Sequence, residues 1–95
     1  MARFFFDFRS GGAFALDEEG IDLLDAEAAH EQAVTALADA IRDGIMEGAM
    51  DQRFIIEVRD NIGRVLNVSA ILGSEIFRKQ VVGAASVLSA RKGHR

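Results

Sequence analysis

Two stretches in which large apolar residues occupy every second position constrain the fold of this 95-residue chain more than any other feature. The first lies within residues 3–9 and precedes the turn sequence Ser10-Gly11-Gly12. The second lies within residues 53–59 and precedes Asp60-Asn61-Ile62-Gly63. A period of two is typical of a half-buried strand, and glycine beside asparagine, aspartate or serine is typical of a tight turn. Because another apolar segment follows each turn, the pattern predicts two β-hairpins.

The register of the first hairpin follows from the side chains that must share a face. A three-residue loop pairs Phe8 with Phe14 and Phe6 with Leu16, and all of these large side chains then lie on one face. A two-residue Gly11-Gly12 loop would turn Phe14 and Leu16 to the other face, because a shift of one residue reverses a strand. We therefore expect the three-residue loop.

The same reasoning sets the register of the second hairpin. Pairing Val58 with Leu66 and Ile56 with Val68 again collects the large side chains on one face. Both hairpins are therefore expected to bury one face and to expose the other.

A helix is predicted between the hairpins, over residues 26–47. Asp25 is a good N-cap, and Gly48 is a natural end for the helix. Apolar residues recur along it at spacings of three and four, which makes one continuous stripe. The stripe consists of Ala29, Ala33, Leu37, Ala40, Ile41 and Gly44. Since its members are mostly small, the helix can approach closely a sheet that carries many phenylalanines.

These elements predict an α+β fold, with a four-stranded antiparallel sheet in the order ββαββ and the helix packed on one face. This domain comprises residues 1–72. Residues 73–95 are expected to form a separate basic helix or tail, in which Ser74 caps a helix over residues 75–91. Its apolar stripe would consist of Phe77, Val81, Ala84, Ala85 and Leu88.

Charge is divided unequally between these two parts. The chain has a net charge of −4, but residues 1–75 hold all 15 acidic residues and residues 76–95 hold none. The basic residues of the tail are Arg78, Lys79, Arg91, Lys92 and Arg95. Such a tail can fold back on its own acidic body, or it can dock an acidic partner, a second copy or a phosphate backbone.

The face of the predicted sheet that points away from the helix is partly apolar. Phe5, Ile55 and Val65 lie there among charged residues. An antiparallel sheet can leave one face in water, but three large apolar residues indicate cover by the C-terminal helix or by a second subunit. The candidate interaction surface therefore consists of Phe5, Ile55, Val65, Arg78, Lys79, Arg91 and Lys92.

Residues suited to catalysis are few. The chain has no cysteine, which excludes disulfides and thiolate zinc sites, and only His30 and His94 could act as bases near neutral pH. No serine lies in a Gly-x-Ser-x-Gly elbow, and the acidic run in residues 17–25 lacks the spacing of a calcium loop. We therefore expect no enzymatic activity, no metal and no cofactor.

Several segments together resemble a known family. They are Arg3-Phe4-Phe5-Phe6-Asp7, the acidic turn of residues 17–20, the Asp25-capped helix rich in alanine, and residues 57–66. In this order they are similar to the DUF6894-like family of small alphaproteobacterial proteins of unknown function, over residues 1–72. The resemblance implies a bacterial origin and brings no catalytic residue. The order of strands and helix also resembles antitoxin domains of the HicB type.

The functional hypothesis is a non-catalytic protein-interaction or oligomerisation module, a homodimer with a regulatory or accessory role. The alternative is an antitoxin-like or nucleic-acid-linked regulator that acts through the basic C-terminal segment. We expect a cytoplasmic protein without a membrane segment. The apolar run at residues 4–6 is too short for a signal peptide, and no stretch of 18 apolar residues occurs.

Overall fold

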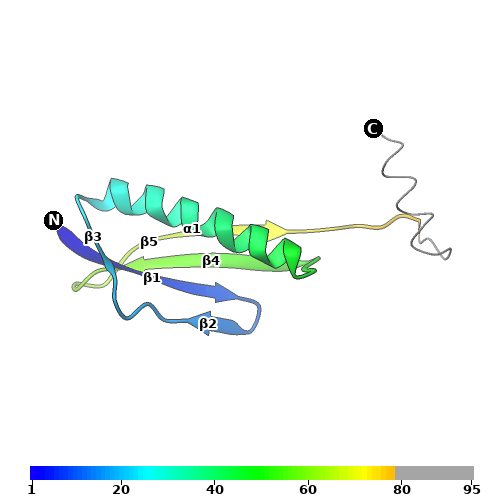
Figure 1. The fold of residues 1–95 in the computed structure, drawn as a ribbon, viewed down its shortest axis with the longest axis horizontal. Helices are drawn as coiled ribbons and strands as arrows, with labels where there is room; N and C mark the ends of the chain where they lie inside the picture. The colour runs from blue at the N-terminus through cyan, green and yellow to red at the C-terminus, as the bar shows by residue number, and fades with distance from the viewer. Residues whose placement is uncertain (79–95) are drawn as a thin grey trace.

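A computed structural model of the chain describes residues 1–78 (Figure 1). The elements in chain order are β1 (Ala2–Ser10), β2 (Ala13–Ala15), β3 (Ile21–Leu23), α1 (Ala26–Met46), β4 (Gln52–Arg59) and β5 (Arg64–Leu72). In this part of the chain the strands form one antiparallel sheet in the order β2-β1-β4-β5, and β3 also pairs with β1. The α+β class is confirmed, but the sheet has five strands instead of the predicted four.

The strand that the sequence did not predict is β3. It pairs with residues 2–4 of β1, whereas β2 pairs with residues 8–10. The two short strands therefore share one edge of β1 and lie at its opposite ends. A strand of three residues is too short for a period of two to be recognised.

The predicted register of the first hairpin is wrong. β1 pairs with β2 through Arg9–Phe14 and Ser10–Ala13, so the loop contains only Gly11 and Gly12. Gly11 has a φ of 58°. A glycine with positive φ at the first central position is the pattern of a type II′ turn, which suits the twist of a hairpin. The geometry of the turn therefore fixes a two-residue loop, although this loop keeps Phe14 and Leu16 out of the core.

This register leaves Phe14 and Leu16 at 48% and 53% exposure, instead of in the core. Phe14 packs under the guanidinium of Arg9, whose Cζ lies 4.4 Å from the ring centroid. A cation–π contact of this kind gives an aromatic ring a place on the outer face. The rule that large side chains must share one face failed because this contact competes with burial.

The predicted register of the second hairpin is confirmed. β4 and β5 pair through Val58–Leu66 and Ile56–Val68. The register then shifts after Val58, so that Arg59 lies opposite Arg64, as in a β-bulge. Oδ1 of Asp60 accepts hydrogen bonds from the backbone N–H groups of Ile62 and Gly63, at 2.9 and 3.1 Å.

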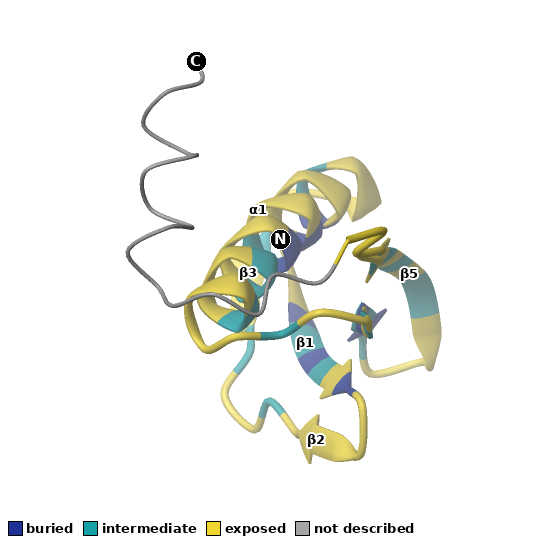
Figure 2. Cartoon of the chain, turned by 90° about the vertical axis from the view of Figure 1, so that its right-hand side faces the viewer, coloured by how far each residue is buried: buried dark blue, intermediate teal, exposed yellow. Residues whose placement is uncertain are grey.

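The predicted helix is confirmed within one residue at its C-terminal end. Oδ1 of Asp25 accepts the N–H of Ala28 at 2.9 Å, as an N-cap does. A Cβ atom on Gly44 would lie 2.8 Å from Cζ of Phe54, so glycine allows α1 to approach the sheet. Figure 2 shows buried residues on β1 and on the side of α1 that faces the sheet. The core comprises Phe4, Ala29, Ala33, Leu37, Phe54, Ile56 and Val58.

The predicted C-terminal helix falls mostly outside the described residues. Residues 73–78 contain no helix, and residues 79–91 are not described. After β5 the chain runs away from the sheet (Figure 1), and Phe77 is 92% exposed. For residues 1–78, α1 does not have the apolar character that a membrane-crossing helix needs.

We predict that Gly11→Ala lowers the free energy of unfolding by about 1–2 kcal/mol, because a Cβ atom disfavours positive φ. Gly12→Ala is the matched control, since a Cβ atom at this position would have no neighbour within 4 Å and the φ of Gly12 is not positive. Urea denaturation of both variants measures the difference. Equal loss in both variants would contradict the two-residue turn.

Candidate interaction surfaces

A buried carboxylate organises the outer face of the sheet. Asp7 is only 5% exposed, although it lies on the face away from α1. Its Oδ2 accepts a hydrogen bond from Nε of Arg59 at 2.8 Å, and its Oδ1 accepts the backbone N–H of Asp17 at 2.9 Å. Asp7 therefore links β1 to β4 and to the loop that follows β2.

Asp17 satisfies the part of the β1 edge that has no strand beside it. Its Oδ2 accepts the N–H of Phe6 at 3.0 Å, between the segments of β1 that pair with β2 and with β3. Its Oδ1 accepts the N–H groups of Glu19 and Gly20 at 3.0 and 3.1 Å. The side chain thus replaces a strand partner and also holds the loop in place.

Arg59 completes this cluster, which we call the Asp7 network: Phe5, Asp7, Asp17 and Arg59. Nη2 of Arg59 donates to the backbone oxygen of Asp17 at 2.8 Å. Its Cζ lies 4.6 Å from the centroid of the Phe5 ring. Phe5, predicted to need cover from another helix or subunit, is therefore partly covered by an arginine of its own chain.

The two aspartates of the Asp7 network have lowered pKa values. Burial alone would raise the pKa of Asp7, but the hydrogen bond from Arg59 and that from the Asp17 N–H outweigh burial. Burial would likewise raise the pKa of Asp17, and three backbone N–H donors outweigh it. The hydrogen bond to Asp7 raises the pKa of Arg59. Both carboxylates therefore stay ionised near neutral pH.

The structure separates the predicted candidate residues. Phe5 and Ile55 lie half-buried on the outer face, whereas Val65 is the extra residue of the bulge and packs against the core. Arg78 is exposed in the chain beyond β5. Lys79, Arg91 and Lys92 lie outside the described residues. The described candidates thus do not form one continuous patch.

A second surface is the free edge of β5. Within residues 1–78, β5 has β4 on one side and no strand on the other. It is nine residues long, and residues 65–72 carry no charge. The β1 edge, by contrast, is covered by two three-residue strands and by the Asp17 carboxylate.

An apolar side of α1 lies next to this free edge. α1 packs to an equal extent on β4 and on β5. Asp39 and Asp43 line its β1 side. At about 100° per residue, Val34, Ile41 and Ile45 lie roughly 120–180° around the helix from these aspartates. Val34 and Ile45 are exposed, and Ile41 is partly buried. We call Val34, Ala38, Ile41 and Ile45 the α1 flank.

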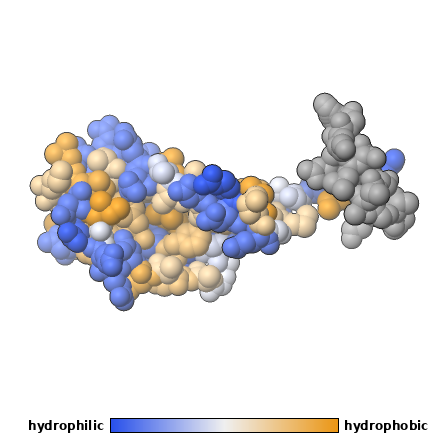
Figure 3. Space-filling view, in the orientation of Figure 1, coloured by the Kyte–Doolittle hydropathy of each residue, from blue (hydrophilic) through white to orange (hydrophobic). Residues whose placement is uncertain are grey.

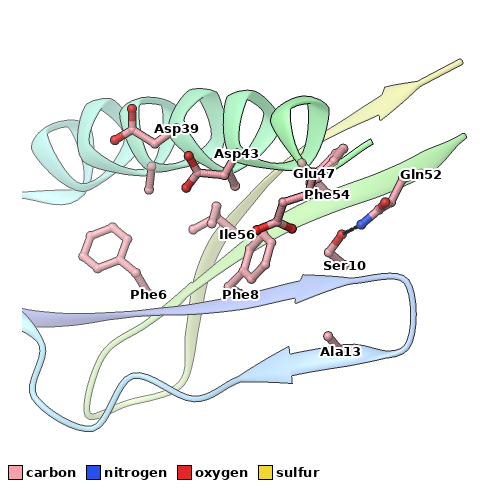
Figure 4. Close-up of a pocket in the computed structure, with 13 residues that line it drawn as sticks. Phe6, Phe8, Ser10, Ala13, Asp39, Asp43, Glu47, Gln52, Phe54 and Ile56 are labelled. Carbon is pink, nitrogen blue, oxygen red and sulfur yellow. Dashed lines mark hydrogen bonds between the residues drawn. The ribbon is translucent and has the colours of Figure 1, made fainter. Parts of the chain in front are cut away.

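A third surface is a groove of about 610 Å³ between α1 and β1 (Figure 4). Its floor is apolar and is formed by Phe6, Phe8, Phe54 and Ile56. Along one rim, Asp39 and Asp43 extend from successive turns of α1, and Glu47 extends from its C-cap. Figure 3 shows hydrophilic side chains along the C-terminal half of α1, with apolar surface beneath them. Ser10 and Gln52, which are hydrogen-bonded to each other, close one end.

A comparison with family models identifies the family of the chain. Residues 3–71 match a family described as a domain of unknown function, DUF6894. The chain belongs to the DUF6894 family. The matched residues of the DUF6894 domain contain the Asp7 network, the groove and all of β5 except its last residue. Neither the curated proteins nor the solved structures gave a match.

The DUF6894 domain carries no evident metal site in the described region: residues 1–78 contain no group of three His, Cys, Asp or Glu side chains placed to hold an ion. The Asp7 network and the groove were not predicted from the sequence. The signals were present, because Asp7 interrupts a run of phenylalanines and three acids recur at every fourth position of the helix.

We predict that Asp7→Asn lowers the free energy of unfolding by about 1–3 kcal/mol, because the change removes the charge to which Arg59 and the Asp17 N–H donate. The lower end is expected, since the Arg59 side chain is partly exposed and can be hydrated. The matched control is Asp22→Asn, which breaks the exposed Arg3–Asp22 pair and should cost little. Urea denaturation at pH 7 measures both. Equal losses would contradict the central role of Asp7.

The pH dependence of stability follows from the same pKa values. The pKa values of Asp7 and Asp17 are lower in the folded chain than the ordinary value of 3.8. Their contribution is therefore complete above that value and is lost as the pH falls through the folded pKa values. We expect stability to be level between about pH 7 and 5 and to fall below about pH 4. Asp7→Asn should flatten this acid limb. An unchanged limb would exclude Asp7 as its source.

Proposed function

We propose that this DUF6894 chain is a non-catalytic homodimerisation module in which β5 of one copy pairs with β5 of another. The observation that carries the proposal is the contrast between the two edges of the sheet. The β1 edge is covered by short strands and a carboxylate, whereas β5 presents nine residues. In natural proteins an edge strand is usually protected from pairing with another chain by a lysine, by a proline or by being short. Residues 65–72 have none of these features.

Pairing of β5 with itself is geometrically simple. An antiparallel pair about a two-fold axis at Val68 uses the regular part of the strand, residues 66–70, beyond the bulge. It places Asn67 opposite Ser69 of the other copy, and Leu66 opposite Ala70. Asn67 and Ser69 are both exposed on the outer face, where they lie beside Glu57 and Ile55 of β4. Neither residue brings a charge to the new pair, so no like-charge contact between them opposes this register.

The helices also fit this arrangement. Because α1 packs equally on β4 and β5, the two-fold axis would place the two helix axes about 10 Å apart, which is two strand spacings of about 4.8 Å. Packed helices lie about 8–10 Å apart. The residues of the α1 flank have the four-three-four spacing of a helix–helix seam. The exposed apolar side chains of Val34 and Ile45 would be buried there.

We predict a species of twice the 10.3 kDa chain mass in sedimentation equilibrium at micromolar concentration. Ile45→Lys should shift this species to the monomer, because it places a charge in the helix seam. Leu16→Lys is the matched control: Leu16 is 53% exposed and Ile45 is 51% exposed, but Leu16 follows β2 at the other edge. A monomeric wild-type chain up to about millimolar concentration, or equal effects of both variants, would refute the dimer.

Two paired variants test the register of this dimer. Asn67→Lys with Ser69→Lys places like charges opposite each other twice and should weaken the dimer at least tenfold. Asn67→Lys with Ser69→Glu places opposite charges together and should keep the dimer near wild-type affinity. Both keep the lysine beside Glu57 within the chain. If the two double variants behave alike, strand β5 is not paired about Val68.

A further inference from the structure

The groove between α1 and β1 lies on the opposite side of α1 from the proposed dimer contact, and it is a separate site. We propose that the C-terminal segment of the same chain, residues 76–95, docks in this groove as an internal ligand. The proposal does not depend on the dimer.

The floor of the groove is apolar, but only its β1 part is accessible, since Phe6 and Phe8 are half-buried whereas Phe54 and Ile56 are buried. α1 packs chiefly on β4 and β5, so Phe6 and Phe8 of β1 are only partly beneath it. Phe6 and Phe8 point from β1 into the gap, together with Phe54 and Ile56 from β4 (Figure 4). Cover by an apolar partner would remove the exposed parts of Phe6 and Phe8 from water and so favour binding.

The rim selects the charge of the partner. Asp39, Asp43 and Glu47 lie four residues apart along α1, and Asp43 and Glu47 extend toward β1 (Figure 4). Among the described residues that line the groove there is no lysine, arginine or histidine. Asp39 is paired with Arg42 of α1, whose Nη2 lies 3.4 Å from its Oδ1, but among the described residues Asp43 and Glu47 form no such pair. The rim therefore keeps a net negative charge, which favours a basic partner and repels phosphate groups. This arrangement argues against a nucleic acid at the groove.

The C-terminal segment has the complementary chemistry. Residues 76–95 carry five basic residues and no acidic one, and their apolar residues follow helical spacing from Phe77 to Leu88. Ile76 and Phe77 are exposed, so the apolar part of the segment begins without cover from the sheet. The acid row spans about 12 Å along α1, and eleven residues of helix would span about 16 Å. An apolar, basic segment therefore matches an apolar, acidic groove in length.

The segment leaves the body close to the groove. The N–H of Ser74 donates to Oδ1 of Asp51 at 3.1 Å. The next residue after Asp51, Gln52, closes one end of the groove with Ser10. If the chain reverses its direction after Ser74, Arg78 and Lys79 meet Glu47 first, and Asp43 lies one helical turn further on.

The absence of cysteine from the chain allows a direct test. Ser86→Cys provides a unique site for a nitroxide spin label, on the side of the segment opposite its apolar stripe. In the full-length, ¹⁵N-labelled protein, docking predicts at least fivefold loss of amide signal at Phe8, Ala40 and Gly44. The turn at residues 60–63 should be unaffected. Unchanged groove signals, or losses centred on the outer face, would overturn the proposal.

Charge variants test the role of the rim. Combining Asp39→Asn, Asp43→Asn and Glu47→Gln should restore most of the groove signal at physiological salt. The matched control combines Glu18→Gln, Glu19→Gln and Glu31→Gln, which changes the net charge equally at exposed sites away from the groove. The control should keep the signal loss. Restoration in both variants, or in neither, would refute recognition by the rim.

A mixed sample identifies which copy supplies the segment. Spin-labelled chain without ¹⁵N is added to ¹⁵N-labelled wild-type chain. Docking within one chain predicts no loss of groove signal in this mixture. Loss in the mixture would show that the segment comes from a second copy and would overturn the proposal as stated. The β5 charge variants leave the groove intact, so failure of the dimer and failure of docking are separate results.

Discussion

The buried carboxylate of Asp7 is the contact on which the rest of this sheet depends. An ionised group with so little exposure is tolerated only because a guanidinium and a backbone N–H donate to it. Those two donors come from β4 and from the loop after β2, so one side chain joins three parts of the chain. The loop in turn places Asp17 against the gap in the β1 edge. Arg59, held by Asp7, covers Phe5. Electrostatics on the outer face thus complements apolar packing on the inner face.

Much of the fold could be predicted from the sequence, and the failures have physical causes. The alternation in residues 53–59 set the second register correctly, because both of its strands are long and pair over most of their length. The first register failed where only three residue pairs exist and the turn geometry decides. There Phe14 found a partner in Arg9 outside the core. β3 carries too few residues for any periodicity to appear.

The candidate surfaces were harder to predict than the elements. Phe5 was correctly placed on the outer face, but its cover by Arg59 depends on a contact across β1 and β4. The acidic row of α1 is visible as a spacing in the sequence. Its importance appears only when Phe6 and Phe8 lie below it. The free edge of β5 likewise depends on strand order, which local periodicity does not encode. Sequence patterns therefore predicted which residues share a face of the sheet. The free edge of β5 and the groove beside α1 became visible only in the structure.

The unequal protection of the two sheet edges also limits how far an assembly of this chain could grow. A sheet with two open edges can add copies at both sides without end, as a fibre does. A sheet with one open edge has no free edge left after a single self-complementary contact, so the assembly closes at two copies. The Asp17 carboxylate, which satisfies the N–H of Phe6, helps to close the second edge. In the proposed dimer, this loop aspartate would therefore also keep a further copy from pairing with that part of β1.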